Sequence, residues 1–162
     1  MWDYAMRLFL IRHAHAGDRT AGSRDKFRPL TPKGHRRAEE LATMLEGQGV
    51  ARVLSSPATR CWQTVAPVAK ALGLEVEEVD ELWEGALLDD VFALFEGLGE
   101  PVVAACSHGD IIPEVVDALN RKGVPVSGRG CEKGSIWVLD HDGRQWTAAA
   151  YVAKSQSQLP AL

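Results

Sequence analysis

The stretch Leu8–Ile11, read Leu-Phe-Leu-Ile, leads directly into Arg12-His13-Ala14-His15. Four apolar residues without a polar break are typical of a short strand that is buried on both faces, as in a parallel sheet. Gly17 and Asp18 then mark a loop. Because open α/β sheets bind ligands at the carboxyl ends of their strands, a fixed cation and an imidazole stand where a ligand is expected. We interpret His13 as the chemical centre of the protein.

The rest of the chain alternates between strand and helix patterns. Apolar runs predict strands at 50–54 and 102–106, and alternating apolar and acidic residues predict an edge strand at 74–79. Asp142-Gly143 predicts a hairpin turn between strands at 134–139 and 145–151. The segment 123–130 is polar and glycine-rich and is expected to be a loop.

Helices are predicted wherever apolar residues recur at helical spacing. The first begins at Pro32, after an N-cap at Thr31, and ends before Gly47. Others are expected between Pro57 and Gly73, at 89–98 and at 111–119. Strand–helix alternation with a terminal hairpin predicts an α/β fold, a three-layer α/β/α sandwich with a mainly parallel central sheet and a C-terminal antiparallel hairpin.

Length and composition indicate an ordinary globular protein. The 162 residues suit one domain, which we expect to span 1–162 with a core of about 7–151 and flexible ends at 1–5 and 155–162. The net charge of −4 argues against a nucleic-acid polymer as partner. No apolar run approaches the ~20 residues of a membrane span, and the first residues lack the pattern of a signal peptide. The three cysteines form no CxxC pair, which fits a cytoplasmic protein without disulfides or structural zinc.

One segment of this acidic chain is strongly basic. Between Arg12 and Arg37 only Asp18 and Asp25 oppose eight cations, which are Arg12, Arg19, Arg24, Lys26, Arg28, Lys33, Arg36 and Arg37. Such a local excess suggests an anionic ligand. The alternative is a solvated basic loop and helix face. Arg19 and Arg28 are candidate substrate contacts, with the same alternative.

Three predicted strands end in residues that could carry chemistry. The first leads to Arg12 and His13, the second to Ser56 and Arg60, and the third to His108. Carboxyl ends of parallel strands lie at one edge of a sheet, so these side chains are expected to converge without an acidic partner among them. A guanidinium suits phosphate, and imidazole is a nitrogen nucleophile near neutral pH.

The predicted reaction is attack of His13 on phosphorus, followed by hydrolysis of the phosphohistidine by water. Arg12, Arg60 and a protonated His108 would hold the negative charge on the phosphoryl oxygens, and Glu84 is a candidate general acid. Other interpretations stay open. His13 and His15 could bind a metal with His108, or His13 could be a core histidine; Arg60 and Glu84 could be ordinary surface charges, and His108 a helix cap.

Five motifs in this order resemble the histidine phosphatase (phosphoglycerate mutase-like) superfamily. Arg12-His13-Ala14 resembles its Arg-His-Gly motif, and residues 28–34 resemble the Arg-Pro-Leu-Thr-x-x-Gly signature of its SixA-like branch. Residues 55–64 are similar to the segment with the second phosphate arginine, Ser107-His108 to the second histidine, and Leu82-x-Glu84 to the acid segment. The resemblance covers residues 7 to about 151.

The resemblance implies a phosphohydrolase that needs no metal and no cofactor, with His13 as nucleophile and Arg12, Arg60 and His108 around the phosphoryl group. Glu84 would be the acid, although SixA-like proteins often lack a clear one, and Ala14 replaces the usual glycine. The expected substrate is a phosphohistidine protein, because the short chain leaves the pocket open. Alternatives are a small phosphate ester or nucleotide, or a non-catalytic module that binds phosphoryl groups.

Overall fold

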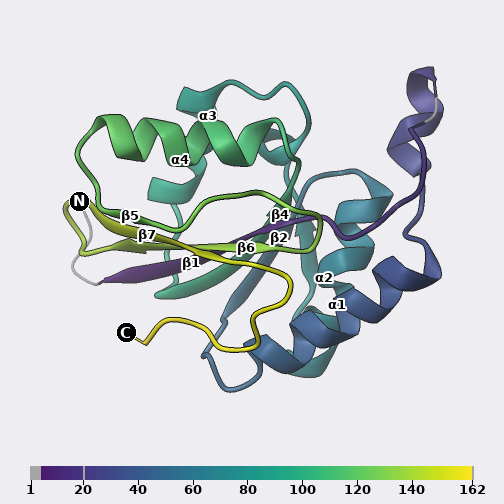
Figure 1. The fold of residues 1–162 in the computed structure, drawn as a ribbon, viewed down its shortest axis with the longest axis horizontal. Coiled ribbons are helices and arrows are strands. Elements are labelled where there is room, and N and C mark those ends of the chain that lie inside the picture. The colour runs from purple at the N-terminus through teal and green to yellow at the C-terminus, as the bar shows by residue number, and fades with distance from the viewer. Residues whose placement is uncertain (1–4, 20, 162) are drawn as a thin grey trace.

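The central element of the fold is β1 (Met6–Arg12), the strand around which a seven-stranded sheet is built (Figure 1). The structure is a computed structural model that describes residues 5–19 and 21–161. The strand order is β3-β2-β4-β1-β6-β7-β5. The remaining strands are β2 (Arg52–Ser55), β3 (Val76–Glu78), β4 (Val102–Ser107), β5 (Val126–Ser127), β6 (Ile136–His141) and β7 (Trp146–Val152).

The sheet is parallel on one side of β1 and mostly antiparallel on the other. β1 pairs in parallel with β4, which pairs with β2, which pairs with β3 at the edge. On the other side β6 is antiparallel to both β1 and β7. The predicted fold class is thereby confirmed. The two-residue strand β5, parallel to β7, lies in the segment predicted as a loop, because two residues are too few to leave a pattern.

Helices cover both faces of the sheet, α1 and α2 on one face and α3 and α4 on the other (Figure 1). Along β1, Phe9 and Ile11 pack with residues of α1 and α2, whereas Leu8 and Leu10 pack with residues of α3 and α4. The helices are α1 (Pro32–Leu45), α2 (Thr59–Leu72), α3 (Leu88–Glu96) and α4 (Ile111–Arg121), with 3₁₀ turns η1 (Gly22–Phe27) and η2 (Asp80–Leu82).

The start of α1 is clamped to the segment that follows β1. The Thr31 hydroxyl caps the helix by accepting a hydrogen bond from the Gly34 backbone N–H, and the Thr31 N–H donates to the His15 carbonyl. A Cβ on Gly34 would lie 2.1 Å from the His15 oxygen, so only glycine permits this approach. The Thr-x-x-Gly pattern therefore holds α1 against the carboxyl edge of the sheet.

The end of the chain lies back against β1. Arg7 donates hydrogen bonds to the carbonyls of Pro160 (2.6 Å) and Ala161 (3.1 Å), and Leu159 packs on the apolar cluster under α1 and α2. These contacts place residues 159–161 against β1 and the cluster under α1 and α2, and the flexible end expected at 155–162 stays a prediction. Of the flexible end predicted at 1–5, residues 1–4 lie outside the described residues. No helix in the described part of the chain is long and apolar enough to cross a membrane.

Candidate active site

The carboxyl ends of β1, β2 and β4 form one edge of the sheet, and the candidate site residues follow these strands. Register pairs Arg12 with Ser107, and Ser55 with Cys106. The next residues along these three strands are His13, Ser56 and His108. Arg60 comes from the first turn of α2, which begins four residues after β2 ends. The parallel pairing thus gathers residues that are up to 96 positions apart in the sequence.

His13 is buried and held in one tautomer. Its Nδ1 lies 2.8 Å from the carbonyl oxygen of Ala14, which can only accept, so Nδ1 carries the proton and Nε2 keeps its lone pair. Burial lowers the pKa of His13 to about 3; the hydrogen bond to Ala14 opposes this shift, and the nearby charges of His108, Arg60 and Arg12 add to it. His13 therefore presents a neutral ring nitrogen in a cationic surrounding.

Arg12 lies flat against the turn that follows β4. Its Nη1 donates to the Cys131 carbonyl at 2.6 Å, and its Nε has no hydrogen-bond partner among the described residues. A Cβ on Gly109 would lie 2.6 Å from Cζ of Arg12, so the guanidinium occupies space that only a glycine leaves open. Arg12 thus keeps one buried guanidinium donor without an acceptor among the described residues.

Arg60 is fully buried beside His108. Its Nη1 donates to the backbone carbonyl of Asp25 at 2.8 Å, and its Nη2 lies 3.3 Å from Nδ1 of His108. The same Nη2 donates to Glu84 Oε1 at 2.5 Å. Arg60 therefore joins η1, Glu84 in the loop after η2, and the second histidine into one cluster.

His108 is fixed by a serine on its other side. Its Nε2 lies 2.8 Å from the Ser56 hydroxyl oxygen and 3.5 Å from the Cys61 sulfur. Its ring centroid is 5.5 Å from that of His13, in an edge-on arrangement. The positioning contact from Ser56 follows from the strand-end pattern, whereas the Cys61 contact left no signal in the sequence.

Two carboxylates contact the cationic cluster, the expected Glu84 and also Asp25. Asp25 Oδ2 is 3.4 Å from Arg60 Nη2, and Glu84 contacts both Arg60 and His108. Burial alone would raise the pKa of Glu84, but the hydrogen bond from Arg19 and the charges of His108, Arg19 and Arg60 together lower it. Asp25 was not predicted as a site residue, since its only sequence signal is its i,i+3 spacing to Arg28.

The two further arginines proposed as substrate contacts differ in their surroundings. Arg19 is exposed and forms a bidentate pair with Glu84, with both N–O distances 3.1 Å. Arg28 is largely buried, and its guanidinium donates to Asp25 and to the carbonyls of Ala16 and Gly17. Arg19 therefore lies at the mouth of the cluster, whereas Arg28 holds the loop together.

Comparison with known proteins decides the family. The family model described as the histidine phosphatase superfamily (branch 1) matches residues 8–91, just over half of the chain. The chain belongs to the histidine phosphatase superfamily. The matched segment contains Arg12, His13, Arg60 and Glu84. The membership predicted from the five motifs is thereby confirmed.

Relatives of this histidine phosphatase have different described functions. The chain is 30% identical over 155 residues to an 8-oxo-(d)GTP phosphatase of Mycolicibacterium smegmatis. The aligned segment covers 90% of this chain but only 48% of that relative. It is 29% identical to a phosphohistidine phosphatase SixA homologue of Haemophilus influenzae, over 75% of this chain and 82% of the relative. The solved structure of a protein histidine phosphatase SixA complexed with tungstate has 26% identity and a TM-score of 0.72, over 91% and 95% of the two chains.

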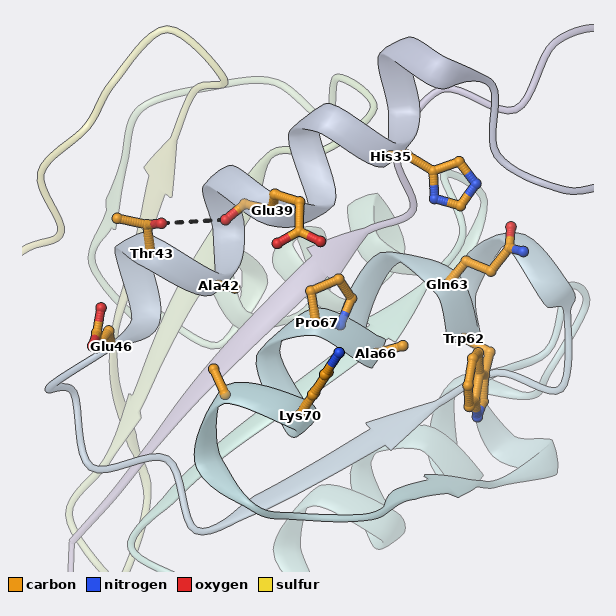
Figure 2. Close-up of a pocket in the computed structure, with 11 residues that line it drawn as sticks. His35, Glu39, Ala42, Thr43, Glu46, Trp62, Gln63, Ala66, Pro67 and Lys70 are labelled. Carbon is orange, nitrogen blue, oxygen red and sulfur yellow. Dashed lines mark hydrogen bonds between the residues drawn. The ribbon is translucent and has the colours of Figure 1, made fainter.

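A hollow on the surface of the protein lies apart from the cationic cluster. It lies between α1 and α2, has a volume of about 690 Å³, and is lined by exposed helix residues such as His35, Glu39 and Trp62 (Figure 2). None of Arg12, His13, Arg60 and His108 lines it. This hollow is therefore separate from the candidate active site. Among the described residues, no group of three or more His, Cys, Asp and Glu side chains is placed to hold a metal ion.

Proposed function

We propose that this histidine phosphatase hydrolyses phosphorylated substrates through a phosphohistidine intermediate on His13. The observation that carries the proposal is the hydrogen bond from His13 Nδ1 to Ala14, which leaves Nε2 with its lone pair beside Arg12, Arg60 and His108. A neutral nucleophile surrounded by cations suits attack on an anionic phosphoryl group.

The reaction has two displacements. In the first, His13 Nε2 forms a bond to phosphorus while the bond from phosphorus to the leaving group breaks. In the second, water attacks phosphorus, the P–N bond breaks, and inorganic phosphate leaves with His13 restored. Arg12, Arg60 and His108 stabilise the charge on the phosphoryl oxygens in both steps. Arg60 is fully covered, so Glu84 and Asp25 must yield to the phosphoryl group.

Glu84 is the proposed proton donor to the leaving group. Its lowered pKa keeps it ionised while Arg19 and Arg60 hold it, so donation requires release from these arginines when substrate binds. A phosphohistidine ring carries its own proton on the second nitrogen and can leave as neutral imidazole. A substrate of this kind makes the smallest demand on Glu84.

The favoured substrate is therefore a phosphohistidine protein, and the SixA relatives support it. The second candidate is a nucleotide. The mycobacterial relative supports it, although this chain spans only about half of that protein, and so does a basic pocket described below. A cytoplasmic location and the absence of nucleic-acid and membrane partners remain part of the proposal.

The test of the chemistry uses p-nitrophenyl phosphate in the presence of EDTA, with wild type beside His13→Ala. We expect wild-type turnover to survive the chelator and the variant to be inactive. Rapid quenching should trap phosphate on His13 that is acid-labile and base-stable. Equal turnover by both proteins would remove His13 from the mechanism, and loss of wild-type activity with EDTA would favour a metal site. A panel of phosphohistidine peptide, nucleoside diphosphates and sugar phosphates ranks the substrates.

A further inference from the structure

A second cationic region lies beside the proposed catalytic cluster. It is a hollow of about 460 Å³, which we call the basic pocket. Five fixed cations and His15 line it against two carboxylates. The lining residues are His15, Lys33, Arg36, Arg37, Glu40, Glu132, Lys133, Lys154 and Ser155.

The topology places the basic pocket at the same sheet edge as His13. Ile11 in β1 pairs with Ile136 in β6, which pairs with Val152 in β7, so Lys154 follows β7 at that edge. His15 is two residues after His13, which limits their Cα separation to roughly 7 Å. Gly134 forms the shared wall: its N–H donates to the carbonyl of His13 at 3.1 Å, and its carbonyl accepts from Arg37 Nε at 2.9 Å.

Arg37 indicates that the pocket is built for an anion. Only 6% of this residue is exposed, yet its Nη2 has no hydrogen-bond partner among the described residues. Its Nη1 pairs with Glu40 at 3.0 Å. A buried guanidinium donor without an acceptor is costly, and an anion in the pocket would relieve that cost after a small side-chain movement.

The first turn of α1 gives a second indication. It contains no acidic residue, and Lys33 and Arg36 lie near the helix N-terminus, where the helix dipole disfavours positive charge. An anion bound between the two side chains and the helix end removes that conflict. Five cations against two carboxylates favour a multiply charged oxyanion such as phosphate over a single carboxylate.

We propose that the basic pocket binds a second phosphate group of the substrate, as in a nucleoside diphosphate, while His13 attacks the terminal phosphorus. The inference rests on the proposed function for the cleavage itself. It takes up the second substrate candidate, the nucleotide, in place of the phosphohistidine protein. It predicts that the pocket determines the KM of substrates with two phosphates and leaves monophosphate esters unaffected.

The kinetic test compares ADP with p-nitrophenyl phosphate in the exposed double variant Lys33→Gln/Arg36→Gln. We expect kcat/KM for ADP to fall about tenfold through KM, because two charge-assisted contacts are lost. For p-nitrophenyl phosphate it should stay within about twofold. The matched control is Arg121→Gln/Arg144→Gln, which removes the same charge from exposed positions at the other end of the sheet. A similar fall for both substrates, or for neither, would overturn the proposal.

A binding measurement separates this proposal from the proposed chemistry. Calorimetric titration of inorganic pyrophosphate into His13→Ala needs no turnover, so it reads the pocket even if the wild type hydrolyses nothing. We expect binding that weakens about tenfold when Lys33→Gln/Arg36→Gln is added and that persists when Arg121→Gln/Arg144→Gln is added. Absent binding, or binding that is indifferent to Lys33 and Arg36, would show that the pocket holds no second phosphate.

Discussion

Gly109 makes room for the guanidinium of Arg12, since a Cβ at position 109 would lie 2.6 Å from Cζ and 2.8 Å from Nε of that arginine. In Gly109→Ala the guanidinium must therefore move away from its present position. Because Arg12 is a proposed ligand of the phosphoryl group, moving it should lower kcat with p-nitrophenyl phosphate about 100-fold.

Gly99→Ala is the matched control for this substitution, because nothing lies within 4 Å of a Cβ at that position. We expect it to keep wild-type activity. Circular dichroism checks that both variants fold. Full activity in a folded Gly109→Ala protein would show that the position of Arg12 is unimportant.

Ser56 is a positioning residue for His108 through its hydroxyl, 2.8 Å from Nε2. Ser56→Ala should lower kcat about tenfold with little change in KM, because the ring loses its orientation but the arginines stay. Ser55→Ala is the control: Ser55 is equally buried, but its hydroxyl donates to the Ser56 carbonyl instead. The two variants should lose similar stability, so an equal loss of kcat in both would contradict the assignment.

Glu84→Gln tests proton donation by comparing leaving groups. p-Nitrophenolate leaves without a proton, so kcat for p-nitrophenyl phosphate should fall less than about threefold. An alkoxide needs a proton to leave, so kcat for an alkyl phosphate should fall about 100-fold. Steady-state kinetics of both substrates measure the split, with the nearby Glu81→Gln as control. If both substrates slow to the same degree, Glu84 has another role, such as holding Arg60.

The lowered pKa of His13 predicts how stability depends on pH. Between pH 6.5 and about 3 the unfolded chain binds a proton on this residue that the folded chain does not. The free energy of unfolding should therefore fall as the pH is lowered through this range, by about 2 kcal/mol between pH 7 and pH 5 from this group. Urea titrations of wild type and His13→Gln at the two pH values isolate the contribution. An identical pH dependence in both proteins would mean that His13 titrates normally.

Gly34→Ala should destabilise the fold rather than the chemistry. Its Cβ would meet the His15 carbonyl oxygen at 2.1 Å, and backbone atoms cannot rotate away as a side chain can. We expect a loss of about 2–3 kcal/mol in the free energy of unfolding, from urea titration. Gly99→Ala should change it by less than about 0.5 kcal/mol. A wild-type stability in Gly34→Ala would show that α1 can shift freely.

Local patterns predicted most of the fold. The apolar run Leu8–Ile11, the Thr31-Pro32 helix start and the Asp142-Gly143 turn each encode one element through nearest-neighbour chemistry, and all three are present. What the patterns missed has no local signal. The short strand β5 exists only because β7 pairs with it.

For the candidate site, the sequence by itself determined that Arg12, His13, Arg60 and His108 lie together at one sheet edge, because they follow strands that their apolar residues predict. Tertiary structure alone decided their state. Three features depend on how the chain is folded in space. They are the carbonyl that sets the tautomer of His13, the carboxylates of Asp25 and Glu84 on Arg60, and the Arg37 donor at the basic pocket. Electrostatic energy varies with the separation and the burial of the charges, and neither quantity can be read from the sequence alone.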